Sequence, residues 1–405
     1  MGRRTDNEME QIHKGLEDFL QRELQLYNME EEKKRNKELD IIGGTRKVTV
    51  ESSRPRSVKK NEMDHSKSDQ NKKTKSDRSQ PDHKKKGSQN KNKKFSFKKF
   101  FLAVALILAL AVFGLYLVVG ALYSKLNYVK IESVAKQPMQ EDGVINILLI
   151  GNDSRMNGDD GRSDAMILLS VSKKTKTIYM TSLLRDMYVE IPGHGGNRLN
   201  AAYSYGGPEL LMETIEQNFD ISVNRYVLVN FEAFANMVES VGGVDLELTS
   251  GEIEYVNGYL IEYNMLTDRP QGTDNMDPSA AGMVHLNGPQ ALAYCRNRYI
   301  GTDFGRTERQ RKVLTEVFKK LPKTLITNSG SLFDGLLPNL TTNLTKNECF
   351  LLSLSGVRFL TYDIVSDNIP QPGTYTSAII RKMDVLQVDF EANKKYLKEK
   401  LYGEK

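Results

Sequence analysis

The strongest hydrophobic feature of the chain is one uninterrupted apolar segment about a hundred residues from its start. Residues 100–124 read FFLAVALILALAVFGLYLVVGALYS and contain no charged side chain. A helix of this length rises about 1.5 Å per residue and spans roughly 37 Å, enough to cross a hydrocarbon core of about 30 Å. A buried helix of a soluble domain is rarely apolar on every face. The pattern therefore predicts a transmembrane helix, not a cleaved signal peptide, which would lie at the N-terminus.

The residues before this segment show two other patterns. Within residues 5–38, apolar side chains recur at helical spacing, which predicts an amphipathic helix that could pair with itself, a protein or the inner leaflet. Residues 52–94 consist mostly of Ser, Lys, Asn, Asp and Gln, so they are expected to be disordered, with their basic end against anionic lipid head groups. A solvated tail that also sets topology explains both patterns at least as well as a specific binding role.

After a juxtamembrane linker of residues 125–143, strand-like and helix-like stretches alternate. Apolar runs of strand length predict strands at 144–150, 165–171, 177–184, 226–229 and 244–248. Helices are predicted at 209–219, behind Gly207-Pro208, at 232–241, from Pro289 onward and at 307–321. Residues 251–280 are rich in Gly, Asn and Asp and are expected to form an insertion or lid. Residues 337–400 are expected to add further strands and a terminal helix.

This alternation predicts the fold class and the domain organisation. Several strands are too apolar for a half-exposed sheet, which indicates helices on both faces. We therefore expect an α/β fold, a three-layer α/β/α sandwich with a central mixed sheet. The expected organisation is a cytoplasmic basic tail over 1–99, the transmembrane helix at 100–124, the linker at 125–143 and an extracytoplasmic domain over 144–401.

The distribution of charge gives this organisation a direction. The formal net charge is +5, but residues 1–99 hold 27 Lys and Arg against 17 Asp and Glu, and the remainder holds 30 against 35. The basic excess thus belongs to the tail and does not indicate nucleic-acid binding by the large domain. Residues 71–99 carry 12 Lys and Arg, whereas residues 124–143 carry three. The positive-inside rule therefore places residues 1–99 in the cytoplasm and 125–405 outside, away from ATP and chromosomal DNA.

Several common chemistries find no support in the composition. Two cysteines, Cys295 and Cys349, cannot form a disulfide-rich scaffold or a zinc site, and two buried free thiols are favoured over one bridge. Only His194 and His285 lie in the large domain, and no His pair has metal-ligand spacing. There is no Walker A motif and no serine in a nucleophile elbow. Cys295 is interpreted as a packing residue.

Charged residues instead gather where the predicted strands and helices end. In chain order they are Asp153 and Arg155, Arg162 and Asp164, Arg185 and Asp186, Arg296 and Arg298, then Asp303, Arg306, Arg309, Gln310 and Arg311. Ligands of open α/β sheets bind near such ends. Several Arg forks together suit a ligand with several negative charges, such as a pyrophosphate, and Asp carboxylates suit a Mg²⁺ ion that also binds phosphate. Ordinary Arg–Asp pairs that cap strands and helices remain the alternative.

These same segments carry a resemblance to a known family. In order along residues 144–320, the chain reads INILLIGNDSR, GRSDAMILLSV, TSLLRDMYVEIPG, LNAAYSYGGPELL, VGGVDLEL, HLNGPQALAYCRNR and FGRTERQRKVL. This series resembles the LytR-CpsA-Psr family of cell-envelope proteins. The resemblance implies a membrane-anchored α/β/α domain that holds a polyprenyl pyrophosphate lipid. It also implies an enzyme, a phosphotransferase that moves anionic glycopolymers (teichoic acid or capsular polysaccharide) from that carrier to peptidoglycan with Mg²⁺.

Carried over residue by residue, the resemblance assigns roles to named positions. It implies metal binding by Asp153 and Asp164. For the transfer itself we expect Arg185, Arg298 and Asp303 to be catalytic, with Asp303 or Asp186 as the base or with positioning alone in place of a base. The resemblance implies pyrophosphate binding by Arg162, Arg185, Arg296, Arg298, Arg306 and Gln310. The long tail departs from the family pattern, and there is no second membrane pass or accessory domain of the kind that some members carry.

The expected function is therefore phosphoryl transfer at the outer side of the cell membrane of a Gram-positive type bacterium. The expected partners are the lipid-linked glycopolymer, peptidoglycan and membrane lipid, with no nucleic acid. Two other interpretations fit the same residues. One is a hydrolase of polyprenyl pyrophosphate that uses water as the acceptor. The other is a membrane-anchored envelope regulator or scaffold, of the transcription-attenuator type, that acts through its cytoplasmic tail.

Overall fold

A computed structural model describes residues 97–134, 137–152, 163–297, 300 and 302–403. The chain divides into two units, and the larger one contains the described residues from 109 onward. The helices of the described residues are α2 (Phe97–Tyr123), α3 (Leu199–Phe219), α4 (Phe231–Ser240), α5 (Ser250–Leu266), α6 (Gly288–Arg296), α7 (Asp303–Thr327), α8 (Ser329–Leu336), α9 (Lys346–Phe359) and α10 (Phe390–Tyr402), with the 3₁₀ turns η1 (Pro278–Ala280) and η2 (Leu337–Asn339).

A mixed sheet forms the centre of the larger unit. Its strands run in the order β1-β11-β8-β3-β4-β5-β12, and β2 pairs with β3. They are β1 (Asn127–Tyr128), β2 (Gln140–Glu141), β3 (Val144–Asn152), β4 (Ser163–Ser172), β5 (Thr177–Leu183), β8 (Arg225–Val229), β11 (Leu340–Thr342) and β12 (Asp363–Ile369). The neighbours β3 and β8 are parallel, as are β5 and β12, whereas β3–β4 and β4–β5 are antiparallel. Strand pairs of both kinds make this the mixed sheet that the sequence predicts.

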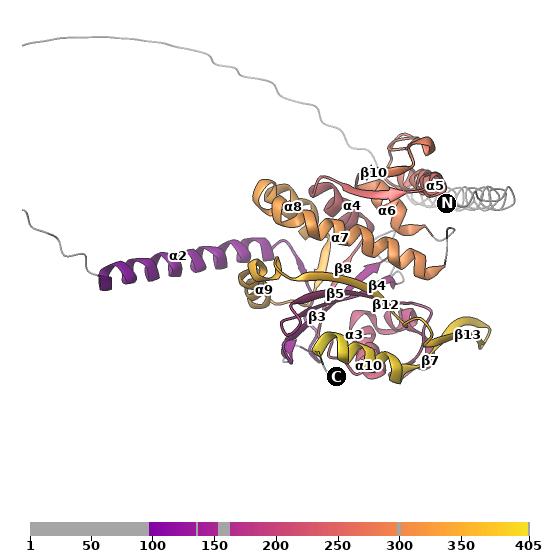
Figure 1. The fold of residues 1–405 in the computed structure, drawn as a ribbon, viewed down its shortest axis with the longest axis horizontal. Coiled ribbons are helices and arrows are strands. Elements are labelled where there is room, and N and C mark those ends of the chain that lie inside the picture. The colour runs from indigo at the N-terminus through magenta and orange to yellow at the C-terminus, as the bar shows by residue number, and fades with distance from the viewer. Residues whose placement is uncertain (1–96, 135–136, 153–162, 298–299, 301, 404–405) are drawn as a thin grey trace, which may run out of the picture. The chain divides into compact units, whose positions relative to one another are not determined.

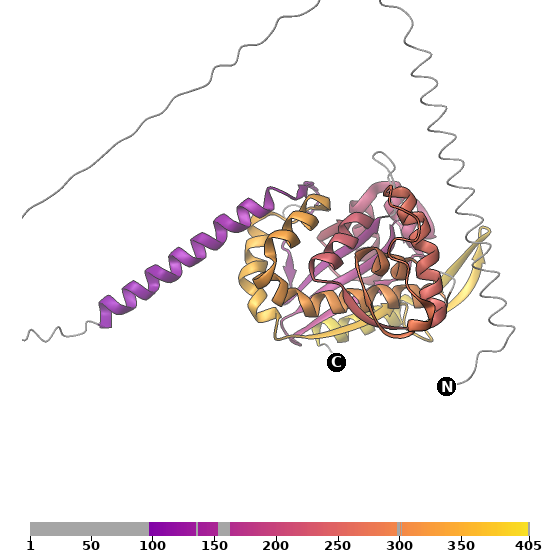
Figure 2. The ribbon, with the colours of Figure 1, turned by 90° about the horizontal axis from the view of Figure 1, so that it is seen from above.

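Helices cover both faces of this sheet (Figure 1). On one face α3 and α10 pack over the strands, and Leu148, Leu168, Ile215 and Leu397 belong to one buried cluster there. On the other face lie α4, α6 and α7, which Figure 2 shows in front of the strands. A second cluster joins α4, α5, α6 and α7 to β9 and β10. The three-layer α/β/α prediction is therefore confirmed.

Among the described residues, three two-stranded sheets lie outside the main sheet. They are β6 (Tyr188–Ile191) with β7 (Gly195–Arg198), β9 (Val244–Leu248) with β10 (Gly282–Leu286), and β13 (Tyr375–Ile380) with β14 (Met383–Val388). All three are antiparallel. The central strands coincide with the predicted apolar runs, because a strand buried on both faces must be apolar almost throughout.

Two helices differ from their predictions. Residues 251–280 do not form an open insertion, because α5 occupies the first half of that range. Its N-terminus carries a capping box between Thr249 and Glu252, and Ile253 and Leu260 are fully buried. Helix α3 begins eight residues before the predicted Gly207-Pro208 start and has a kink there, where Gly206 and Gly207 leave helical geometry. The Gly-Pro pair thus marks a break inside a longer helical segment.

Of the described helices, α2 alone is long and apolar enough to cross a membrane, through Phe100–Tyr123. Its composition and length fit a single-pass anchor, as the sequence predicts. The amphipathic helix, linker and orientation predicted for the first 96 residues lie outside the described residues. The organisation of the chain into tail, anchor, linker and outer domain therefore stays a prediction.

Candidate functional site

Arg185 lies at the centre of a charged cluster at one edge of the sheet. It follows β5, and its Nη1 lies 2.7 Å from Oδ1 of Asp164 at the start of the antiparallel neighbour β4. Its Nε lies 3.5 Å from Oδ2 of Asp186 and 3.7 Å from Oδ1 of Asp303 on α7. Antiparallel pairing brings the end of β5 beside the start of β4, and the N-terminus of α7 lies at the same place. Three carboxylates from three segments thus surround one guanidinium.

Burial and charge act in opposite directions on this guanidinium. Burial lowers the pKa of Arg185, whereas the negative charges of Asp164, Asp303 and Asp186 raise it. The charges together outweigh burial, so the pKa of Arg185 lies above its usual value. Arg185 therefore stays cationic at every physiological pH. The Arg185 side chain is 22% exposed, so part of its guanidinium group is accessible to an anion.

Arg306 is the most deeply buried charged member of the cluster, with 2% of its side chain exposed. Its Nη2 lies 2.7 Å from Oδ1 of Asp303, one helical turn earlier on α7, and donates a hydrogen bond of 3.0 Å to the carbonyl oxygen of Asp164. Asp303 lies in the first turn of α7, where a carboxylate also interacts favourably with the helix dipole. The two arginines therefore share Asp303 and both contact Asp164.

A cavity of about 560 Å³ lies directly beside these groups. Its wall includes Asp164, Arg296, Arg306 and Gln310, and otherwise consists largely of apolar side chains from the sheet and the covering helices, among them Leu149, Ile167, Val227, Phe231, Phe234, Met237, Leu292, Leu314, Phe318, Leu336 and Leu340. This size is typical of ligand sites in proteins. A cavity wall with a large apolar surface and arginines at one side suits an amphiphilic ligand with an anionic head group.

Arg296 lines the same cavity, but a carboxylate already balances its charge. Its Nη1 lies 2.7 Å from Oε2 of Glu262, and both side chains are largely buried. Its guanidinium carbon lies 4.7 Å from the ring centre of Phe231 and 5.3 Å from that of Tyr259. The stacking and the ion pair fix the guanidinium plane against the cavity wall.

Two other arginines of α7 belong to the packing around the site. Nε of Arg309 lies 3.8 Å from Oε1 of Glu252, and its Nη2 donates to the carbonyl oxygen of Ile300. Nη1 of Arg311 donates to Oγ of Ser182 at 2.6 Å, and burial lowers the Arg311 pKa. Because they lie on other sides of α7, neither lines the cavity that Arg306 and Gln310 line.

Several predicted site residues cannot be placed. Asp153, Arg155, Arg162 and Arg298 lie outside the described residues. The structure therefore brings together Asp164, Arg185, Asp186, Asp303, Arg306, Gln310 and Arg296. The remaining assignments stay predictions.

Some polar atoms at and near the cavity are of the kind that a Mg²⁺ ion binds. Oδ2 of Asp303 and Oε1 of Gln310 are buried and find no hydrogen-bond partner among the described residues. Asp164 adds a carboxylate on the cavity wall. No group of three or more His, Cys, Asp or Glu side chains in the described part of the chain forms a ready cation cage. These hard oxygens fit an ion held by one or two carboxylates that completes its shell with phosphate oxygens and water.

The comparison with family models decides the classification. The LytR_cpsA_psr family model matches residues 117–399, well over half of the chain. The chain belongs to the LytR_cpsA_psr family. This match confirms the resemblance carried by the motifs, and it shows that the LytR_cpsA_psr region includes the described site and most of the final helix α10.

Named relatives agree with this classification. The LytR_cpsA_psr chain is 35% identical over 233 residues to the polyisoprenyl-teichoic acid–peptidoglycan teichoic acid transferase TagU of Oceanobacillus iheyensis, covering 55% of this chain and 66% of that protein. It is 32% identical over 262 residues to TagU of Bacillus cereus, covering 60% and 79%. The chain thus spans just under two thirds of the first relative's length.

Solved structures show the same fold. A structure described as TagT bound to LIIa-WTA is 27% identical, with a TM-score of 0.53, and covers 68% of this chain and 99% of its own. The crystal structure of B. subtilis TagT is also 27% identical, with a TM-score of 0.51 and the same coverage. The LytR_cpsA_psr domain described above therefore corresponds to nearly the whole of each TagT chain.

The structure adds two charged residues that the motifs did not single out. Glu262, on the helix α5 that was expected to be a lid, forms the ion pair with Arg296. Nη1 of Arg198 lies 3.6 Å from Oδ1 of Asp186 and extends the charged cluster. Arg198 is the last residue of the Gly-rich strand β7, and that strand-end position was the available signal. Both thiols are free, as the composition favours, and Cys295 is buried.

Proposed function

We propose that this protein is a transferase that moves an anionic glycopolymer from a polyprenyl pyrophosphate carrier to peptidoglycan. The observation that carries the proposal is a pair of neighbouring arginines at one side of a largely apolar cavity: Arg306, buried on the cavity wall, and Arg185, partly buried and sharing Asp303 with it. The names of the TagU relatives, and TagT bound to LIIa-WTA, support the same class of substrate.

The cavity explains why the ligand has two chemically different parts. An isoprenoid chain gains free energy by leaving water for the apolar wall, at about 25 cal/mol for each Å² buried. The pyrophosphate requires permanent positive charge, which Arg185 and Arg306 supply, together with Arg296 and, in this proposal, Arg162 and Arg298. Asp164, Asp303 and Glu262 form ion pairs with Arg185, Arg306 and Arg296. A bound pyrophosphate would compete with these carboxylates for the guanidinium groups.

The proposed reaction is a phosphoryl transfer. A hydroxyl oxygen of a peptidoglycan sugar forms a bond to the glycopolymer-side phosphorus, the bond from that phosphorus to the bridging oxygen breaks, and polyprenyl phosphate leaves. The hydroxyl proton passes to a carboxylate, either Asp303, whose buried Oδ2 has no hydrogen-bond partner among the described residues, or Asp186. The arginines stabilise the negative charge on the phosphate oxygens and hold the reactants in line.

In this proposal Asp153 and Asp164 would hold a Mg²⁺ ion on the pyrophosphate. When bound, the ion would neutralise charge on the phosphate oxygens. Asp164 stands at the cavity wall, so its carboxylate could turn from Arg185 to such an ion when phosphate takes the guanidinium.

The proposed location is the outer side of the cell membrane. The apolar helix α2 would span the membrane once, with residues 1–99 inside. This orientation would place the site on the side where peptidoglycan is found.

The test compares full-length protein in lipid nanodiscs with two variants. Arg185→Ala should lower conjugate formation from lipid-linked glycopolymer and peptidoglycan fragments by about a hundredfold or more, as expected when a preorganised charge on the transition state is lost. Lys319→Ala removes an exposed partner of Glu316 and should leave the rate unchanged. A wild-type rate in Arg185→Ala would contradict the proposed role of Arg185 in pyrophosphate binding. Release of phosphorylated polymer without any conjugate would instead identify a hydrolase.

A further inference from the structure

The outer side of α9 is apolar although nothing in the described part of the chain covers it. Leu351 is 54% exposed, Leu354 43%, Val357 77%, and Leu360, just beyond the helix, 60%. These four residues, spaced three apart, form a band along the helix that we name the outer stripe. The opposite side of α9 already packs on the sheet, where Cys349, Leu352 and Phe359 contact a buried cluster. Packing within the domain therefore explains why the inner side of α9 is apolar, but it does not explain why the outer side is apolar.

The first turn of α9 contacts the last turns of the membrane-spanning helix. The rings of Tyr116 on α2 and Phe350 on α9 meet edge to face with centres 5.2 Å apart. Nζ of Lys346 lies 4.2 Å from the centre of the Tyr116 ring, and the Tyr123 hydroxyl donates to the carbonyl oxygen of Leu344 at 3.0 Å. Val119 of α2 is 7% exposed. Helix α9 is thus held against the anchor itself.

Helix geometry places this contact at the membrane boundary. If the hydrocarbon core begins at Phe100, its thickness of about 30 Å corresponds to about 20 helical residues, which ends near Val119. Tyr116 then lies inside the apolar layer, and its ring partner Phe350 lies beside it. The beginning of the outer stripe is only one residue away, at Leu351.

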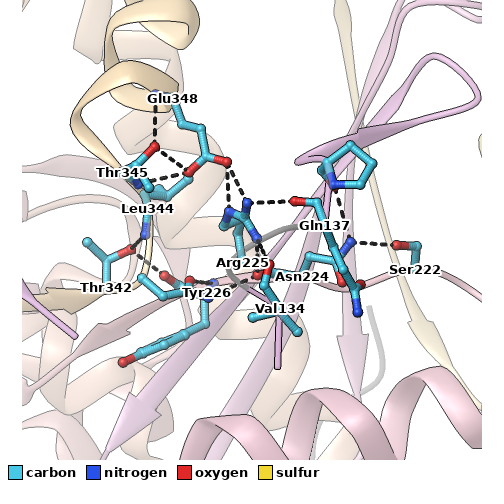
Figure 3. A network of polar contacts seen from close by, with 12 residues as sticks. Val134, Gln137, Ser222, Asn224, Arg225, Tyr226, Thr342, Leu344, Thr345 and Glu348 are labelled. Carbon is cyan, nitrogen blue, oxygen red and sulfur yellow. Dashed lines mark hydrogen bonds and ion pairs between the residues drawn. The ribbon is translucent and has the colours of Figure 1, made fainter. Parts of the chain in front are cut away.

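A buried polar network holds the start of α9 against strand β8 of the central sheet (Figure 3). Glu348 closes the capping box of α9 with Thr345, and its Oε1 lies 2.6 Å from Nη2 of Arg225 on β8. The same guanidinium donates to the carbonyl oxygens of Val134 at 3.2 Å and Gln137 at 2.9 Å, in the segment that follows α2. The start of α9, the juxtamembrane segment and the central sheet are therefore fastened at one point.

The charges of α9 also suit a lipid surface. Its one carboxylate, Glu348, points inward to Arg225, whereas Lys346 and Arg358 are cationic. Arg358 is exposed on the same side as the stripe. An apolar band with cations and no exposed carboxylate is the pattern of a helix that lies in the interface of an anionic membrane.

We propose that the outer stripe of α9 inserts into the head-group boundary of the membrane that α2 spans, as a second, shallow lipid contact. Because Arg225 belongs to β8, and Val227 and Val229 of β8 line the cavity, this contact would set the orientation of the cavity relative to the bilayer. The inference rests on α2 being the membrane anchor, as given under the proposed function, and does not depend on the transfer chemistry.

The chain contains no tryptophan, so single tryptophans can report on depth. Full-length Val357→Trp and Leu354→Trp place the reporter on the outer stripe. Leu110→Trp, at a 60% exposed position of α2, reports on the anchor, and Met283→Trp, at a 73% exposed apolar position of β10, is the matched control. Each variant is reconstituted into phosphatidylcholine–phosphatidylglycerol vesicles with and without lipid brominated on its acyl chains.

Both stripe reporters should show blue-shifted emission and lose about half or more of it in brominated lipid, because an interfacial helix buries its apolar side about 5–10 Å deep. Met283→Trp should keep its emission and remain accessible to aqueous iodide. Stripe reporters that behave like Met283→Trp, while Leu110→Trp is quenched, would overturn the proposal and leave the anchor intact. Blue-shifted but unquenched stripe reporters would assign the stripe to a protein partner and equally overturn it. Unquenched emission from Leu110→Trp would show that α2 does not span the bilayer and would overturn the proposal as well.

Discussion

Arg225 is the residue on which the largest stability prediction depends. Its side chain is 4% exposed and that of Glu348 14%, so removal of one partner leaves a buried charge without its counter-ion. Burial alone would raise the pKa of Glu348, but hydrogen bonds from Arg225 and Thr345 hold it below its usual value. We expect Arg225→Ala to lower the free energy of unfolding by about 3–5 kcal/mol.

The measurement is thermal unfolding of the full chain in detergent micelles. The control Lys312→Ala removes one partner of an exposed ion pair with Glu308, which contributes about 0–1 kcal/mol. Equal melting temperatures for Arg225→Ala and Lys312→Ala would show that the buried network does not hold the domain together.

The two thiols should be unreactive in the native protein. Burial, followed by the nearby charge of Glu348, raises the pKa of Cys349 to about 11, and burial raises the pKa of Cys295 as well. A raised pKa means that the neutral thiol is the native form, and that this contribution to stability is present below about pH 8.5 and is lost as the pH rises toward 11. At pH 8 we expect iodoacetamide to modify the native chain at least roughly tenfold more slowly than free cysteine.

Mass spectrometry of intact protein checks this expectation. The unfolded chain should gain two adducts at the rate of free cysteine, whereas the native chain should gain none over the same time. Rapid modification of native Cys349 would show that α9 opens readily from the sheet.

At the residue scale, contacts between side chains on one element could be predicted from their spacing. The exact pairs formed between separate elements could not. Asp303 and Arg306 are one turn apart, so their ion pair follows from helix geometry alone. Helical periodicity also places Gln310 with Arg306. The grouping of Asp164 and Asp303 around Arg185 depends on the tertiary fold, which local pattern does not contain, and so does the pairing of Glu262 with Arg296.

At the element scale, the kink in α3 offers a sharp prediction. Gly207 has φ 62° and ψ −155°, a region in which side chains with a Cβ are strained. Gly207→Ala should therefore lower the free energy of unfolding by about 1–3 kcal/mol. Gly356→Ala is the matched control, because Gly356 lies inside α9 with no atom within 4 Å of the added Cβ, and should raise stability by about 0.5–1 kcal/mol. Chemical denaturation of both variants, side by side, measures the difference. Unchanged stability in Gly207→Ala would mean that the kink relaxes without cost.

Elements were predicted well where hydrophobic pattern determines structure and poorly where composition obscured it. The strands β3, β4 and β5 are nearly continuous apolar runs because both sheet faces are covered. Helix α5 was missed because Gly, Asn and Glu lie among its apolar residues, and the whole stretch was interpreted by composition. Ile253, Val256 and Leu260 have the spacing of one helix face and are buried, so the periodic signal was present.

At the scale of the whole molecule, the question is whether the tail or the outer domain performs the function. Among the described residues, those that form the cavity and its charged cluster lie between Leu149 and Leu340. An enzyme whose chemistry lies in this cavity should therefore keep its activity when residues 2–90 are deleted, since α2 and the basic residues beside it remain.

This deletion separates the proposed transferase from a regulator that acts through its tail. The shortened protein, reconstituted in vesicles, should form glycopolymer–peptidoglycan conjugate within about twofold of the full-length rate, because the transition-state contacts are unchanged. Arg185→Ala in the shortened protein should lose that activity as it does in the full chain, which excludes a contaminating enzyme. Loss of activity on deletion, with the membrane fraction of the protein unaltered, would assign the tail an essential part in the reaction. Because the tail carries the basic excess of the chain, that result would point to its contact with anionic lipid as the next interaction to remove.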